Sequence, residues 1–84
     1  MKFSPEVKEE NRRLRRLALM VDLTIQILAQ TEELTLNEAF MHIRAARQYA
    51  VHLFPGKGEV FDLIYRPRML RVLKERGMLP WETN

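Results

Sequence analysis

Cysteine is absent from this sequence, so the chain can form neither a disulfide bond nor a thiolate metal site, and it has no thiol nucleophile. Long apolar runs are absent too. The longest stretch, residues 17–29, is too short to cross a bilayer and contains Asp22, Thr24 and Gln26. The first residues lead into charged side chains rather than into the apolar segment of a secretory signal. We therefore expect no transmembrane helix and a cytoplasmic location.

Glycine and proline are scarce, with three glycines and four prolines among 84 residues, and residues 6–54 contain neither. Nothing in that segment interrupts a helix. Hydrophobic residues make up 46% of the sequence and charged residues 30%, which is typical of a folded chain rather than a disordered one. A chain of this length buries only about 60–65% of the surface of its unfolded form. We therefore expect one small domain, residues 1–84, with a thin core.

The first predicted helix covers residues 5–30. Ser4 and Pro5 are residue types favoured at an N-cap and at a first helical position, and the helix they begin is about 39 Å long at 1.5 Å per residue. Its second half carries an apolar arc of about 220°, which is wider than a helix packed on one side needs. The residues of this arc are Leu17, Met20, Val21, Leu23, Ile25, Ile27 and Leu28.

A capping box predicts the second helix, over residues 36–54. Thr35 and Glu38 have the spacing at which each side chain accepts a hydrogen bond from the other residue's backbone. Apolar residues then recur on one side of the segment, and Pro55 and Gly56 provide its stop. The first two helices should therefore form an antiparallel hairpin.

A third helical element is predicted over residues 59–76, with a kink at Pro67, because proline lacks a backbone donor and clashes with the preceding turn. Gly77 is suited to cap its C-terminus, and residues 77–84 should form an irregular tail. The predicted fold is thus all-α, a hairpin braced by a kinked third element. We expect oligomerisation to complete a helical bundle.

The wide arc of the first helix predicts self-association, because two packed neighbours leave part of a 220° arc open. A two-fold dimer is the commonest closed solution for a soluble homo-oligomer. Met20, Leu23 and Ile27 form the edge of the arc that we expect to cross the interface. The arc residues that we expect to meet the chain's own second helix are Val21, Ile25 and Leu28.

Two charged residues stand beside apolar surface and predict a packing pair. Arg47 falls between apolar positions of the second helix, where an unpaired charge is costly. Asp22 lies beside the apolar run of the first helix with no basic residue three or four positions away. We expect Asp22 and Arg47 to pair and so to fix the register of the two helices. The alternative is that Arg47 extends its charged end to water.

Basic residues suggest a second kind of contact, with the phosphate groups of nucleic acid. The net charge is +3 with a pI near 9.7, which permits binding to nucleic acid without requiring it. The candidate phosphate contacts on the third element are Arg66, Arg68, Arg71 and Lys74. Acidic residues dilute this set, and no base-reading motif accompanies it, so we do not favour nucleic acid as the partner.

Two residue pairs are candidates for a reactive site. Glu38 and His42 share a helical face at metal-ligand spacing, but the capping box already accounts for Glu38. Arg47 and His52 form an Arg-x4-His pattern that resembles the signature of HEPN-type ribonucleases, and the resemblance covers these two residues only. It implies an RNA-cleaving dimer, since two side chains about 140° apart on one helix converge only through a neighbouring chain.

Surplus apolar surface is therefore a more prominent feature of the sequence than any reactive group. We predict a non-catalytic helical interaction or assembly module that self-associates, and we expect no cofactor and no metal site. A different, unknown protein partner remains an alternative occupant of the apolar surface. The alternative function is a small nucleic-acid-binding or regulatory protein that uses its arginine-bearing helices, and an enzyme comes third.

Overall fold

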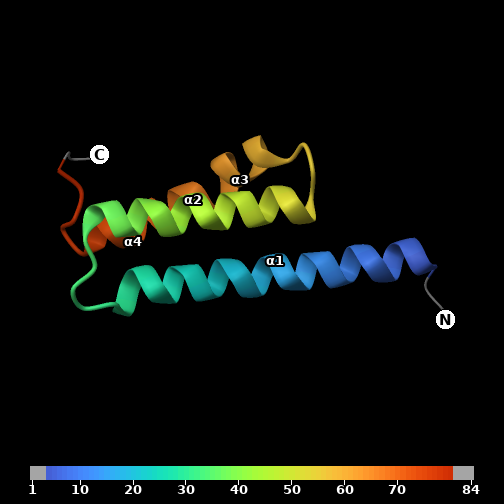
Figure 1. Cartoon of the computed structure of the whole chain (residues 1–84), viewed down its shortest axis with the longest axis horizontal. Helices are drawn as coiled ribbons and strands as arrows, with labels where there is room; N and C mark the ends of the chain where they lie inside the picture. The colour runs from blue at the N-terminus through green and yellow to red at the C-terminus, as the bar shows by residue number, and fades with distance from the viewer. Residues whose placement is uncertain (1–3, 81–84) are drawn as a thin grey trace.

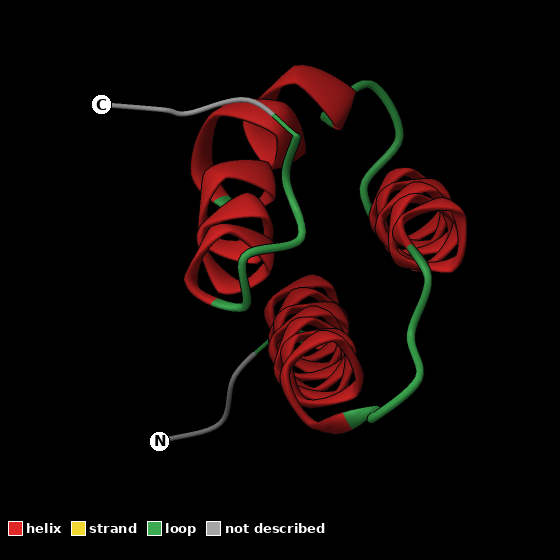
Figure 2. Cartoon of the chain, turned by 90° about the vertical axis from the view of Figure 1, so that its left-hand side faces the viewer, coloured by secondary structure: helices red, strands yellow, loops and turns green. Residues whose placement is uncertain are grey.

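A computed structural model of the chain describes residues 4–80, which form four helices and no strand. The predicted all-α fold is confirmed. The helices are α1 (Pro5–Gln30), α2 (Leu36–Leu53), α3 (Gly58–Ile64) and α4 (Arg66–Glu75). α1 and α2 run in opposite directions as a hairpin, and α3 and α4 return along them as one bent arm (Figure 1). Viewed from the end, α1, α2 and this arm surround a shared interior (Figure 2).

The first two helices begin where the capping residues predict. The Ser4 hydroxyl accepts a hydrogen bond of 3.3 Å from the Val7 N–H, and Pro5 is the first residue of α1. At α2, the Thr35 N–H donates to Glu38 Oε1 over 2.9 Å, and the Glu38 N–H donates to Thr35 Oγ1 over 3.1 Å. All three backbone donors are satisfied by side chains only three residues away, so these helix starts are encoded locally.

The bend between α3 and α4 lies just before the proline that predicts it. α3 ends at Ile64, Tyr65 forms the break, and Pro67 is the second residue of α4. The kink therefore precedes Pro67 by two residues. Proline disfavours helical geometry at the residue before it and collides with the carbonyl four residues earlier, so the strain is relieved upstream of the ring.

Gly77 ends α4, as expected, with a φ angle of +71°. Its N–H and the N–H of Met78 donate to the carbonyls of Lys74 and Leu73, both over 2.9 Å. These two bonds make a Schellman motif, which favours glycine because the left-handed conformation carries no side-chain penalty there. The last four residues of the predicted tail, 81–84, lie outside the described residues.

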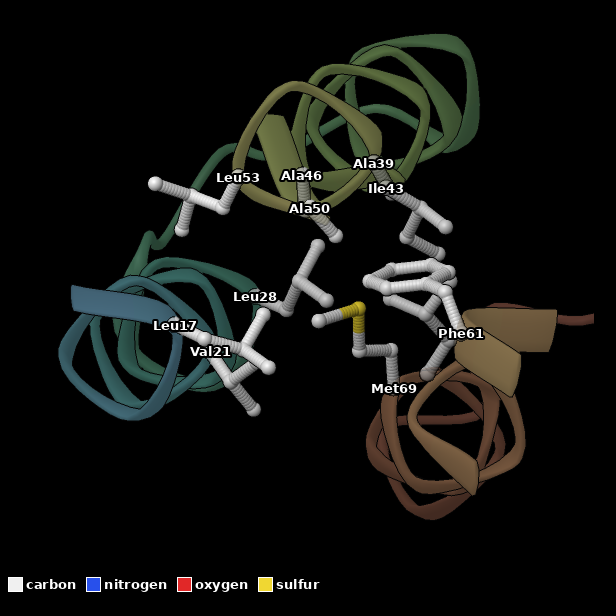
Figure 3. Close-up of a cluster of buried hydrophobic side chains, with 11 residues drawn as sticks. Leu17, Val21, Leu28, Ala39, Ile43, Ala46, Ala50, Leu53, Phe61 and Met69 are labelled. Carbon is white, nitrogen blue, oxygen red and sulfur yellow. The ribbon is translucent and has the colours of Figure 1, made fainter. Parts of the chain in front are cut away.

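The core lies where α1, α2 and the arm formed by α3 and α4 meet. Leu28 of α1 and Met69 of α4 are fully buried, and Phe61 of α3 is 2% exposed (Figure 3). α2 contributes small side chains to this interior, including Ala46 and Ala50. Small side chains on α2 let the neighbouring helices approach it closely. The remaining fully or largely buried core residues are Leu17, Val21, Ala39, Ile43, Leu53 and Leu73.

Arg76 joins the end of the arm to the end of α1. Its guanidinium donates to the backbone carbonyl of Leu28, and over 2.7 Å to that of Thr31. The last turn of α1 contains no basic residue of its own, and its terminal carbonyls have no partner within the helix. Arg76 supplies both a donor and a favourable charge at this end of the helix dipole.

The chain is elongated because α1 is longer than its partners. Its radius of gyration is 14.9 Å, against about 12 Å for a compact domain of this length. The N-terminal turns of α1 extend past the end of α2 (Figure 1). Residues 5–12 are all exposed. Across residues 4–80, none of the helices combines the length and the apolar character needed to cross a membrane.

Candidate interaction surfaces

One side of α1 carries apolar side chains that the rest of the chain does not cover. Leu19, Leu23 and Ile27 follow at intervals of four residues and are 61%, 50% and 39% exposed. Met20 lies beside them and is half-buried. The three residues of the predicted interface therefore lie on one accessible side of α1. We call Leu19, Met20, Leu23 and Ile27 the α1 stripe.

One wall of a groove is formed by Leu19, Met20 and Leu23 of the α1 stripe. A cavity of about 300 Å³ lies between α1 and α2, and its lining is mostly apolar. Tyr49 of α2 forms the opposite wall, is 38% exposed, and stacks on His52 with 6.4 Å between the ring centroids. On the α1 side, the Thr24 hydroxyl lies 3.7 Å from the Met20 sulfur. The groove is therefore shaped by two helices, so a partner can contact both.

Leu19 and Tyr49 were missing from the predicted interface. The four-residue spacing from Leu19 to Leu23 and Ile27 was a usable signal, because it repeats one helical face. Tyr49 gave no such signal, since its place opposite α1 depends on how α2 is rotated against it. The inner edge of the arc faces the interior of the chain. Val21 and Leu28 are buried in the core, and Ile25 packs against it.

Arg47 does not pair with Asp22, and this prediction is wrong. Its Nε donates to Asp62 Oδ1 over 2.8 Å, and its Nη2 donates to Asp62 Oδ2 over 3.1 Å. Asp22 is exposed on α1. Arg47 lies about 80° round α2 from the centre of the buried face, on the flank that meets α3, so its side chain leads away from α1. The pair still joins two elements, but they are α2 and α3.

Gly58 makes room for this pair. A β-carbon at Gly58 would lie 2.6 Å from Arg47 Nη2 and 3.0 Å from its Cζ, which is closer than atoms pack. The guanidinium therefore rests directly against the first turn of α3 and reaches Asp62 one turn further on. The sequence prediction begins the third element at residue 59, after Gly58, and misses this contact, because nothing local to the glycine indicates which side chain crosses it.

The pair shifts the protonation equilibria of both partners. The hydrogen bond from Arg47 holds the pKa of Asp62 below its ordinary value, and the nearby charges of Arg47 and Arg66 act in the same direction. The bond to Asp62 raises the pKa of Arg47. Separately, the hydrogen bond from the Thr35 backbone lowers the pKa of Glu38. Both carboxylates are thus favoured in their charged forms by the fold.

A second cavity, of about 640 Å³, lies against α2 on the side where Arg47 projects. We call it the arginine cleft. Three guanidinium-bearing residues line it, Arg44 and Arg47 from α2 and Arg66 from the start of α4. None of its lining residues is acidic. Its remaining lining residues are Asn37, Phe40, Met41 and Ile43.

The four basic residues proposed for phosphate contact are divided between two surfaces. Arg66 lines the arginine cleft, whereas Arg68 and Arg71 are exposed on α4. At 100° per residue, Arg66 is about 140–160° round the helix from Arg68 and Arg71. Lys74, also exposed, lies between these directions. The four residues therefore do not make one continuous basic face.

The two candidate reactive pairs do not assemble a site within the chain. Glu38 is engaged in the capping box, and no group of acidic or histidine residues in residues 4–80 is arranged to hold a metal ion. Arg47 lies against α3, whereas His52 stacks on Tyr49 beside the α1 stripe. Arg47 and His52 therefore project to different sides of α2.

Another exposed apolar group lies on α3. Val60, Leu63 and Ile64 are 42%, 78% and 52% exposed. The helix that carries them has only seven residues, and Val60 also lines a smaller apolar pocket of about 210 Å³ between α1, α2 and α3. This group is more exposed than the α1 stripe but shorter, which makes it a useful comparison for any test of association.

Comparison of the chain with known protein families, with curated proteins and with solved structures finds no match.

Proposed function

We propose that the chain is a non-catalytic helical interaction module that self-associates as a two-fold dimer through the α1 stripe. The observation that carries this proposal is the row of exposed Leu19, Leu23 and Ile27 beside the α1–α2 groove. Water-exposed leucine and isoleucine side chains one helical turn apart form a continuous apolar surface, which soluble proteins usually cover. A second copy covers it with the same residues.

The spacing of the stripe is self-complementary. If α1 packs antiparallel on the partner's α1 with the two-fold axis at Leu23, then Leu19 of one copy lies opposite the partner's Ile27. Leu23 then meets the partner's Leu23. A two-fold interface requires this reciprocal arrangement, in which the same surface serves both copies. Two α1–α2 hairpins joined in this way make a four-helix layer with a shared apolar seam.

Charge supports the antiparallel direction. Arg12, Arg13 and Arg16 precede the stripe, and Arg16 lines the groove itself. Glu32 and Glu33 follow the stripe and are exposed. Antiparallel packing about Leu23 brings the arginine-bearing turns of one copy toward the partner's Glu32 and the partner's Glu33. Parallel packing would instead place like charges together, which is unfavourable.

The available surface is large enough for such a dimer. A stable protein interface covers about 800 Å² on each partner, which is roughly an eighth of the 6550 Å² exposed by the chain. α1 extends for about 39 Å, and its exposed N-terminal turns can lie along the partner beyond the apolar seam. The stripe supplies the apolar centre of the interface, and the charged turns supply its rim.

The test compares Leu23→Glu with Leu63→Glu. Sedimentation equilibrium and far-UV circular dichroism are measured on the same samples. We expect Leu23→Glu to remove the dimer while leaving helicity unchanged, because Leu23 is half-exposed in the single chain. Leu63→Glu places the same charge at a position that is 78% exposed on α3, and it should leave the dimer intact. Equal loss of association in both variants would contradict the proposed surface.

A further inference from the structure

The arginine cleft is independent of the proposed dimer surface. On α2, the cleft residues Arg44 and Arg47 lie about 140–160° round the helix from Tyr49, which borders the α1 stripe. The cleft also receives Arg66 from the start of α4, so two elements distant in sequence contribute to it. Its volume of about 640 Å³ is in the range of small-molecule sites.

The guanidinium groups of the cleft have donors to offer. The described part of the chain gives Arg44 no hydrogen bond and no ion pair. Arg47 uses two of its five N–H donors on Asp62 and retains three. Asp62 and Glu59 lie near Arg47, but neither lines the cleft. A molecule in the cleft therefore meets the guanidinium of Arg44 and the remaining donors of Arg47, whose charge is partly balanced by Asp62 outside the cleft lining.

Part of this site is already ordered before any ligand arrives. Arg47 is held by two hydrogen bonds to Asp62 and by close packing over Gly58. A side chain that is fixed in advance loses less conformational entropy when a ligand binds. Arg47 thus serves as a positioned anchor in a cleft that Arg44 and Arg66 also line.

We propose that the arginine cleft binds an organic phosphate, namely a phosphate monoester carried on an apolar or aromatic body. A carboxylate has two oxygens and is matched by a single guanidinium fork, whereas a terminal phosphoryl group presents three acceptor oxygens. Three guanidinium-bearing residues around one cleft suit the phosphoryl group better. Phe40, Met41 and Ile43 line the same cleft and offer an apolar surface to the organic part of the ligand.

Phenyl phosphate is the probe for this proposal, with inorganic phosphate, benzoate and phenol for comparison. Binding is measured by chemical-shift titration of the full chain at constant ionic strength. We expect phenyl phosphate to bind at least tenfold more tightly than benzoate, because additional charged hydrogen bonds form. It should also bind more tightly than inorganic phosphate, and phenol should not bind measurably. Equal affinity for phenyl phosphate and benzoate would overturn the proposal.

Matched variants place the binding at the cleft. Arg44→Gln should weaken phenyl phosphate binding about tenfold without changing the circular dichroism spectrum, since Arg44 is exposed and has no hydrogen bond or ion pair in the described part of the chain. Arg71→Gln removes the same charge from the exposed face of α4 and should leave the affinity within twofold. Equal losses in both variants would show general attraction to a basic protein and would contradict a built site.

Met41→Ala tests whether the apolar wall of the arginine cleft contacts the organic part of the ligand. Met41 is 65% exposed, so its truncation should not disturb the core. We expect the preference for phenyl phosphate over inorganic phosphate to fall severalfold while the affinity for inorganic phosphate stays constant. An unchanged preference would remove the apolar wall from the proposal.

If a single-stranded oligonucleotide without a terminal phosphate displaced phenyl phosphate in an Arg44-dependent way, the cleft would bind a phosphodiester strand, and the monoester proposal would fail.

Discussion

Two leucines of α1 provide a matched test of how the fold divides this helix between core and surface. Leu28 is completely buried, whereas Leu23 is 50% exposed, and both lie within the last three turns of the same helix. Replacing either residue by alanine removes the same atoms and changes helix propensity by the same small amount. Any difference between Leu28→Ala and Leu23→Ala must therefore come from what surrounds the two side chains.

The burial of Leu28 sets the expected magnitude. A fully buried leucine replaced by alanine costs about 3–4 kcal/mol, because the transfer energy is lost and a cavity remains. The total stability expected for this length is about 4–13 kcal/mol, so Leu28→Ala removes a large part of it. Each kcal/mol lowers the Tm by about 4–8 °C in a domain of this size, which gives a decrease of at least about 12 °C. Leu23→Ala should cost less than about 1 kcal/mol in the single chain.

Thermal melts followed by circular dichroism measure the change in Tm caused by each of the two substitutions. They are recorded at low micromolar concentration and repeated after tenfold dilution, so that any contribution from association is recognised by its dependence on concentration. The reasoning would be refuted if Leu23→Ala lowered the Tm of the dissociated chain as much as Leu28→Ala. In that case the outer side of α1 would be packed within the monomer, and the α1 stripe would not be an open surface.

Two further predictions concern the pair between Arg47 and Asp62. Gly58→Ala should stabilise the chain only when Arg47 is also replaced by methionine, because the added β-carbon gains helix propensity but displaces the guanidinium. Additive effects in thermal melts of the single and double variants would contradict the close contact. Asp62→Asn should lower the Tm at pH 7, and the difference from the unmodified chain should shrink as the pH falls below about 4. The sign follows from the lowered pKa of Asp62 in the folded chain. The charged carboxylate stabilises the folded state at pH values above the pKa of the unfolded chain, and this stabilisation is lost when Asp62 is protonated at lower pH. Asp22→Asn is the control, and an equally large effect at pH 7 would argue against the assigned partner.

Local signals in the sequence were sufficient for the helices. Ser4, the Thr35–Glu38 box and Gly77 act through hydrogen bonds to residues within a few positions, so their effects are readable without knowledge of the fold. The α1 stripe was also largely predictable, because exposure follows from an apolar arc wider than its neighbours can cover.

Contacts between distant elements were not predictable in the same way. The partner of Arg47 depends on the rotation of α2 about its own axis and on the bend that brings α3 over it. Neither quantity is encoded by the residues next to Arg47. The same holds for the arginine cleft, since Arg66 joins Arg44 and Arg47 only after α3 and α4 have folded back along α2.

Sedimentation equilibrium of the unmodified chain tests the central claim most directly. The single chain has a mass of 10.0 kDa, and the account predicts that the average mass rises to about twice this value between low and high micromolar concentration. The Tm should rise over the same range, because association stabilises the folded state. A mass that stays at 10.0 kDa at several hundred micromolar, together with a melt that is independent of concentration, would contradict self-association through the α1 stripe.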